Sequence, residues 1–136
     1  MGRRHKAVVL GLLVVAVTGW ILVNPGGGFG LSRFGLTTYN RLPIPVIDFE
    51  VRADGAVRWI TKTHDIQAQG LTWLLTPLPP EVVILALGWR NAAHGPTDLA
   101  LSGTKIIVLP TDEALALYNV LKQRGVRVAI HVHSTC

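Results

Sequence analysis

The C-terminal part of the chain, residues 106–136, changes its hydrophobic period twice. Residues 106–109 form a short β-branched apolar run, which is typical of a buried strand. Apolar residues then recur every three or four positions, which predicts an amphipathic helix with Thr111 as its N-cap and Gly125 as its stop. Residues 126–132 alternate between apolar and other side chains, as a strand with one buried face does. Two strands joined through one helix predict a right-handed parallel β-α-β unit.

A β-hairpin is predicted around Gly55, with a three-residue loop in which this glycine takes the positive-φ position. That loop length places Val51 opposite Val57 on one face of the hairpin. It also places Glu50 opposite Arg58 on the other face, so that apolar and charged side chains are separated. A two-residue turn would mix them on both faces, and we therefore favour the longer loop.

The run Val82–Leu87 is the most continuous apolar stretch after the N-terminus, which favours a central parallel strand covered on both faces. Gly88 follows it directly. We favour a tight turn at this glycine, and the alternative is a position where a ligand or a partner segment approaches the backbone. Residues 61–80 predict at most a short helix, because Gly70 interrupts the apolar pattern and three prolines end it.

An uncharged, strongly apolar run extends from Ala7 to Val23 and follows a basic tail, residues 1–6. The run is just long enough to span a bilayer. A cleaved signal peptide usually has a shorter apolar region that ends in small residues, and residues 17–19 match such a site poorly. We therefore favour a retained transmembrane helix, with cleavage as the alternative. Representative anchor positions are Ala7, Leu12, Val15, Trp20 and Val23.

The basic tail determines the predicted orientation in the membrane and accounts for most of the net positive charge of the chain. Its lysine and arginines should stay in the cytoplasm, which puts the rest of the chain on the periplasmic or extracytoplasmic side. Arg3, Arg4 and Lys6 also supply three of the five net positive charges, so the remaining chain is nearly balanced. Nucleic acid is therefore not an expected partner, whereas the lipid bilayer is. The mean hydropathy of +0.40, high for a soluble protein, agrees with a membrane anchor.

Residues 24–45 are rich in glycine and proline and show no sustained period, so we interpret them as a linker. The glycines do not form a phosphate-binding loop, because no strand precedes them and the Lys-Ser/Thr of a P-loop is missing. The predicted organisation is a basic cytoplasmic tail (1–6), a transmembrane helix (7–23), a Gly/Pro-rich linker (24–45) and an α/β domain with a mixed sheet (46–136).

The histidines and the cysteine near the C-terminus are the residues most suited to metal chemistry. His131 and His133 lie at alternate strand positions, hence on one face, and Cys136 follows. A structural metal site would need a fourth ligand, and no CxxC or HxxxH pair supports one. We favour two polar residues on the less buried strand face. No catalytic residue, cofactor or metal is assigned, and enzyme activity stays open with non-catalytic function favoured.

Several short sequences near the C-terminus resemble one small α/β family. They are Leu109-Pro110-Thr111, Glu113-Ala114, Tyr118-Asn119, Leu121, Gly125-Val126-Arg127-Val128 and His133-Ser134-Thr135-Cys136. The family includes the adipogenesis-associated Mth domain protein of vertebrates and an assembly factor of mitochondrial respiratory complex I. The resemblance implies a fold and a role in protein interaction or assembly, and it brings no agreed catalytic residues.

Two helix residues, the predicted N-cap and one turn glycine are assigned a structural or partner-binding role. Asn119 is unfavourable inside a helix unless its amide finds a partner, and with Tyr118 it is expected to fix the helix against the sheet. The full set is Gly88, Thr111, Tyr118 and Asn119.

The expected function is that of a non-catalytic accessory or assembly subunit of an integral membrane protein complex, respiratory or photosynthetic. Anchoring raises the effective concentration of the domain at a partner in the same membrane. The alternative is a small-molecule-binding or metal-binding enzyme that uses the face with His131, His133 and Cys136.

Overall fold

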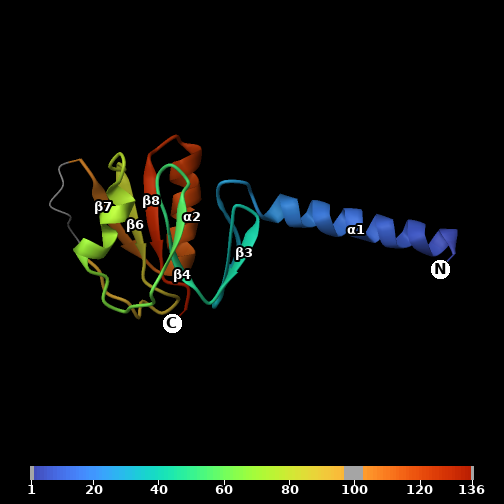
Figure 1. Ribbon diagram of the computed structural model, residues 1–136, viewed down its shortest axis with the longest axis horizontal. Helices are drawn as coiled ribbons and strands as arrows, with labels where there is room; N and C mark the ends of the chain where they lie inside the picture. The colour runs from blue at the N-terminus through green and yellow to red at the C-terminus, as the bar shows by residue number, and fades with distance from the viewer. Residues whose placement is uncertain (1, 97–102, 136) are drawn as a thin grey trace.

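The uncharged run 7–23 forms one helix together with the basic residues that precede it, α1 (Arg3–Val23), and none of its residues is buried. The computed structural model describes residues 2–96 and 103–135. Figure 1 shows α1 projecting away from the α/β domain. Beyond its charged first turn the helix carries no charge, and it has the length and composition needed to span a membrane.

The domain is built on a five-stranded mixed sheet in the order β5-β4-β8-β6-β7. β8 pairs antiparallel with β4 and parallel with β6, and β6 pairs parallel with β7. The strands are β4 (Asp48–Val51), β5 (Val57–Ile60), β6 (Val82–Ala86), β7 (Lys105–Leu109) and β8 (Val128–Val132). The predicted mixed α/β fold is confirmed, and β6 is the buried parallel strand that its apolar run indicates.

The C-terminal β-α-β unit runs β7, α2 (Thr111–Gln123), β8. β7 and β8 are parallel but not adjacent, because β6 lies between them. The helix packs on one face of the sheet through Ala114, Leu115 and Tyr118, all of which are buried. The N-cap is Pro110, not Thr111 as expected, because the hydroxyl of Thr111 is bonded to the strand ends rather than to the helix.

The hairpin of β4 and β5 has the predicted register. Val51 lies opposite Val57, and Glu50 lies opposite Arg58. Gly55 has a φ of +88°, the conformation that this turn requires. Separation of apolar from charged side chains is therefore a sufficient guide to the register of this hairpin.

The second face of the sheet is covered by a 3-10 helix, η1 (Ala68–Leu75), where the sequence predicts at most a short helix. Leu71 and Leu74 are fully buried there against β6. The connection between β6 and β7 has no helix within its described parts, 87–96 and 103–104.

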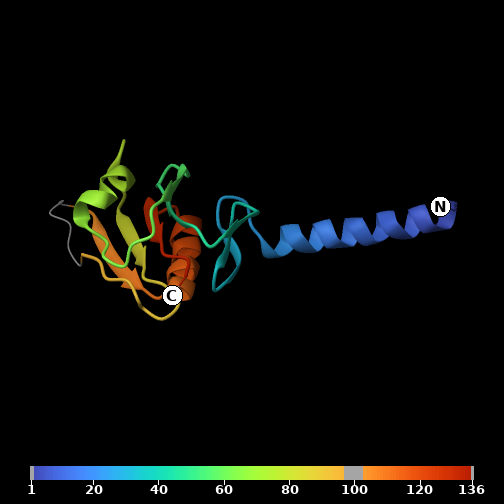
Figure 2. The same ribbon diagram turned by 60° about the horizontal axis from the view of Figure 1, so that its bottom comes forward.

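The interpretation of residues 24–45 as a linker is wrong. This segment forms a three-stranded antiparallel sheet in the order β1-β2-β3. Its strands are β1 (Phe29–Arg33), β2 (Leu36–Tyr39) and β3 (Leu42–Pro45). Phe29, Tyr39 and Ile44 join the core beneath α2. Figure 2 shows the small sheet between α1 and the main domain. Strands this short, interrupted by glycine and proline, carry too few residues for a visible period.

Candidate functional site

The two C-terminal histidines are buried, which corrects the expectation of a polar, less covered strand face. His131 on β8 is 4% exposed, and His133, just after the strand, is fully buried. All five residues of β8 are buried because the strand sits in the middle of the sheet with α2 on one side and η1 on the other. Both histidines then need polar partners, and β4 supplies them.

Glu50 and His131 form a buried pair across β4 and β8. They are directly opposite in the register, and Nδ1 of His131 lies 3.0 Å from Oε1 of Glu50. The other carboxylate oxygen accepts a hydrogen bond from Nε of Arg58 at 2.8 Å. Arg58 also donates to the carbonyl of Gly70 at 3.0 Å and lies over the ring of Trp73. The buried carboxylate is therefore paired on both oxygens.

This pairing fixes the hydrogen on the His131 ring. A carboxylate oxygen only accepts, so Nδ1 carries a hydrogen, and when the ring is neutral Nε2 is then an acceptor. Nε2 is buried and has no hydrogen-bond partner within residues 2–96 and 103–135. An unsatisfied buried acceptor costs roughly 1–3 kcal/mol. The arrangement leaves one oriented acceptor on the pocket side of the sheet.

Asp48 and His133 repeat the arrangement two positions further along, beyond the Phe49–Val132 pair and just after the end of β8. Nδ1 of His133 lies 2.6 Å from Oδ2 of Asp48. The other oxygen, Oδ1, accepts from the backbone N–H of Ser134 at 2.9 Å and from its hydroxyl at 3.1 Å. The ring of His64 meets that of His133 edge to face, with centroids 5.2 Å apart. Asp48 thus holds the chain after β8 against the sheet.

The predicted metal set is not assembled in the described part of the chain. His131 and His133 do share a face, as expected, but each turns Nδ1 to a carboxylate. Cys136 lies outside the described residues. No group of three His, Cys, Asp or Glu side chains suited to a metal occurs among residues 2–96 and 103–135.

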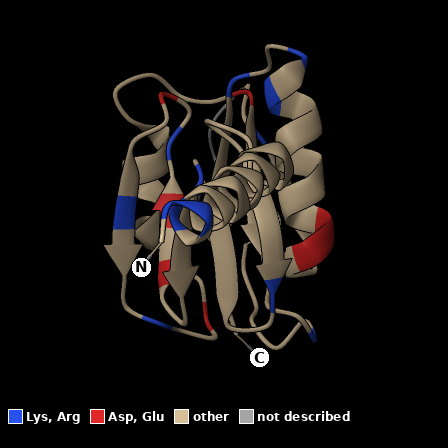
Figure 3. Ribbon diagram, turned by 90° about the vertical axis from the view of Figure 1, so that its right-hand side faces the viewer, with Lys and Arg blue, Asp and Glu red and all other residues tan. Residues whose placement is uncertain are grey.

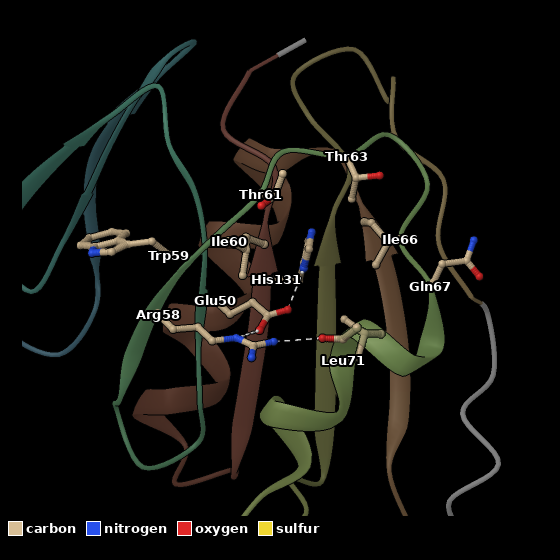
Figure 4. A pocket seen from close by; sticks show the side chains of 11 residues that line it. Glu50, Arg58, Trp59, Ile60, Thr61, Thr63, Ile66, Gln67, Leu71 and His131 are labelled. Atoms are coloured by element: carbon tan, nitrogen blue, oxygen red, sulfur yellow. Dashed lines mark hydrogen bonds and ion pairs between the residues drawn. The ribbon is translucent and has the colours of Figure 1, made fainter.

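A cavity of about 280 Å³ opens beside the Glu50–His131 pair (Figure 4). In Figure 4 the imidazole of His131 lies between Glu50 and the side chains of Thr61, Thr63 and Ile66. Its second nitrogen points away from the carboxylate. The residues that line the cavity come from β4, β5, β8, η1 and the segment leading into η1. The sequence signal that could have found this pair is the matched spacing of Asp48 and Glu50 on β4 with His131 on β8 and His133 just after it.

Gly88 and Thr111 connect the ends of three strands. Gly88 has a φ of +93°, which agrees with the favoured turn. Its N–H donates to the hydroxyl of Thr111 at 3.0 Å, and that hydroxyl donates to the carbonyl of His133 at 2.8 Å. The described contacts of Gly88 are thus those of a turn held by the first residue of α2.

Tyr118 lies in the aromatic core between α2 and the small sheet. Its ring meets Phe29 edge to face at 5.0 Å, and its hydroxyl lies 3.5 Å from that of Tyr39. Burial raises the pKa of Tyr118 far above its ordinary value, and the hydrogen bond with Tyr39 adds to the shift. The tyrosine therefore stays neutral and acts as a packing residue.

Asn119 has the partner that its position demands, but the partner is β1 rather than the main sheet. Its Oδ1 accepts from the N–H of Phe29 at 2.8 Å, and its Nδ2 donates to the carbonyl of Phe29 at 2.7 Å. The side-chain amide of Asn119 thus bonds to the backbone of β1 as a neighbouring strand would. It joins α2 to the segment that follows α1.

Replacing Asn119 with alanine should lower the free energy of unfolding by about 1–3 kcal/mol, because it leaves both backbone groups of Phe29 without their partner. Denaturant unfolding of the full chain in detergent measures this change. Gln123→Ala, near the end of the same helix, is the control and should change stability by less than about 0.5 kcal/mol. Equal effects of the two variants would show that the amide does not hold β1.

The helix α1 is joined to the domain by hydrogen bonds. Asn24, the residue after α1, is fully buried, and its side chain accepts from the N–H of Leu31 at 2.8 Å and donates to the carbonyl of Trp20 at 3.0 Å. A Cβ on Gly30 would meet Asn24 at 2.2 Å, so only glycine allows this approach. The indole of Trp20 donates to the carbonyl of Arg41 at 3.1 Å.

The helix itself divides into a charged tip and an uncharged length. Figure 3, viewed toward α1, shows Lys and Arg at its N-terminal tip and neither charge along the rest. The predicted anchor positions Leu12, Val15, Trp20 and Val23 are all exposed. Of these, Trp20 also contacts the domain.

An apolar groove of about 400 Å³ lies between the small sheet and the β4–β5 hairpin. Leu42, 66% exposed, and Trp59, 61% exposed, lie along it. Leu42 directly follows Arg41, the residue that Trp20 binds, so the groove begins beside the C-terminal end of α1. The residues that line it are Tyr39, Asn40, Leu42, Pro43, Ile44, Gly55, Val57 and Trp59.

Comparisons with known proteins found similar solved structures. No protein-family model matches the chain, and no curated protein does. A structure described as MT938 has 30% sequence identity and a TM-score of 0.70, and the match covers 80% of this chain and 98% of that one. A conserved hypothetical protein from Pyrococcus horikoshii OT3 has 20% identity and a TM-score of 0.64, covering 79% and 98%. A protein from Bordetella parapertussis has 18% identity and a TM-score of 0.60, covering 77% and 92%. The last two show the fold alone, and none of these descriptions states an activity.

Proposed function

We propose that this chain, which belongs to the same family as MT938, is a non-catalytic accessory or assembly subunit of an integral membrane protein complex. The description of MT938 states no activity, so the proposal rests on the surfaces of this chain. The helix α1 anchors it in the bilayer, with the basic tail in the cytoplasm. The α/β domain then binds a partner on the periplasmic or extracytoplasmic side.

The observation that carries this proposal is the bonded junction between α1 and the domain. A flexible linker would let the domain take any orientation above the membrane. Here Asn24 and Trp20 tie the end of the helix to β1 and to the β2–β3 turn. A fixed orientation lowers the entropy lost on docking, and anchoring raises the local concentration. Both effects favour an interaction with a partner in the same membrane.

The apolar groove beside Leu42 and Trp59 is the docking surface. It starts one residue from the anchor contact at Arg41, so a partner in the same bilayer reaches it without leaving the membrane surface. Its occupant is a juxtamembrane segment of that partner with apolar side chains. Exposed apolar grooves on a domain surface are typical of such interfaces.

The resemblance to the Mth-type domain family agrees with this role, since members of that family act in assembly or protein interaction. It carries no site residues, and it stays a prediction. A respiratory or photosynthetic complex is the kind of partner that the resemblance suggests.

A matched pair of leucine variants tests the proposal. Leu42→Ser changes the groove, whereas Leu78→Ser changes a leucine of similar exposure, 59% against 66%, away from it. In native mass spectrometry after gentle extraction from the source membrane, wild type and Leu78→Ser should be recovered in a fixed ratio with larger membrane proteins. Leu42→Ser should lose most of this recovery while staying in the membrane. Equal recovery of the two variants would contradict docking at the groove, and recovery of wild type alone would contradict the accessory role.

A further inference from the structure

We propose that the cavity beside Glu50 and His131 binds a small uncharged compound with a hydroxyl group, which donates a hydrogen bond to Nε2 of His131. This site lies on the side of the β4–β5 hairpin that faces η1. Leu42, the residue used to test docking at the apolar groove, does not line it. It adds a binding function to the proposed accessory role.

The hydrogen-bonding state of the histidine requires a donor from the ligand. Nδ1 is committed to Oε1 of Glu50 at 3.0 Å, so the free nitrogen of the neutral ring can only accept. His131 is more than nine-tenths buried, and Nε2 has no partner in the described part of the chain. A hydroxyl group satisfies this acceptor, whereas an ether or a carbonyl compound brings a second acceptor to it.

The charges around the cavity require an uncharged ligand. The carboxylate of Glu50 is 1% exposed and already pairs with the guanidinium of Arg58 at 2.8 Å. The two charges balance, and the guanidinium is held further by the carbonyl of Gly70. A ligand cation or anion would therefore lie beside the buried carboxylate of Glu50 without a counter-charge, which is costly.

The walls and the volume set the size and character of the rest of the molecule. Ile66 and Leu71 are buried side chains on one wall, while Thr61, Thr63 and Gln67 lie at the more exposed side. About 280 Å³ is just under the usual range for drug-sized ligands. The ligand is thus a compact alicyclic or aromatic alcohol rather than a long chain or a nucleotide.

Two isomers that differ only in the donor provide the test. Cyclopentanol carries a hydroxyl group, and tetrahydropyran has the same formula but only an ether oxygen. The full chain in detergent, with ¹⁵N-labelled histidine, is titrated with each compound. Cyclopentanol should shift the Nε2 signal of His131 in a saturable way, and tetrahydropyran should bind about tenfold more weakly or not at all. Equal binding of the two isomers would overturn the proposal.

Two variants make the result independent of one substitution. In His131→Gln the methyl signals of Ile66 and Leu71 report on the cavity, and the affinity for cyclopentanol should fall about tenfold. If this variant does not fold, Gly70→Val keeps the histidine and adds bulk at the cavity wall, where a Cβ meets no atom within 4 Å. It should weaken cyclopentanol binding to a similar extent.

The same experiment distinguishes a metal from an alcohol. If His131→Gln or Gly70→Val folds and its affinity for cyclopentanol is unchanged, the proposed site is contradicted. A response of the His131 ring to Zn²⁺ alone, with none to cyclopentanol, would also overturn it, because it would assign Nε2 to metal binding. Retained cyclopentanol binding in Leu42→Ser is expected, so loss of docking and loss of this site are separate results.

Discussion

Replacing Phe29 with alanine should lower the free energy of unfolding by about 3–5 kcal/mol. Phe29 is 3% exposed and packs against three aromatic rings, those of Tyr39, Phe49 and Tyr118. Removing the ring leaves a cavity where the small sheet, β4 and α2 meet. The loss should appear in denaturant unfolding of the full chain in detergent, followed by tryptophan fluorescence.

Phe34→Ala is the matched control, because Phe34 lies in the same glycine-rich segment but is 63% exposed. It should change stability by less than about 0.5 kcal/mol. The contrast between the two phenylalanines distinguishes a folded small sheet from a linker. Similar small effects of both variants would mean that residues 24–45 do not contribute to the core.

The second large effect is expected for Asp48→Ala, which should cost about 3–5 kcal/mol of stability. The variant removes a buried carboxylate that accepts from Nδ1 of His133 and from two groups of Ser134. The imidazole and the Ser134 N–H are then buried without partners. Thermal or denaturant unfolding measures the loss.

Asp112→Ala serves as the control for Asp48. Asp112 is exposed in the first turn of α2, where its charge acts only on the helix dipole and is worth about 0.3–1 kcal/mol. A loss at Asp48 no larger than that at Asp112 would show that the pair with His133 does not hold the C-terminal segment.

Local patterns were sufficient for the C-terminal half of the fold. The strand, helix and strand of residues 105–132 each have an unbroken period, and the hairpin register follows from keeping Glu50 and Arg58 on one face. These features depend on residues close in the sequence. Pattern reading therefore predicted them.

The small sheet could not be predicted because its stability comes from distant residues. Its strands have four or five residues each, and β1 is held by Asn119 from α2, ninety positions away. The glycines that suggested flexibility have a different use: Gly30 lets β1 approach Asn24. Composition alone does not distinguish these two roles.

The buried histidine pairs were also missed for a reason of topology. The alternation of β8 indicated one buried and one polar face, but β8 lies centrally and both faces are covered. Glu50 and Asp48 on β4 match the spacing of His131 on β8 and of His133 just after this strand. That correspondence becomes informative only once β4 is known to pair with β8.

Photo-cross-linking from position 42 in native membranes tests most directly whether the anchored domain docks through its groove. A photoreactive amino acid replaces Leu42 at the groove, and in a second variant it replaces Leu78, which lies away from it. We expect position 42 to cross-link to a protein that has membrane spans of its own, and position 78 to give no such product. No adduct from position 42, or the same adducts from both positions, would contradict docking at the groove.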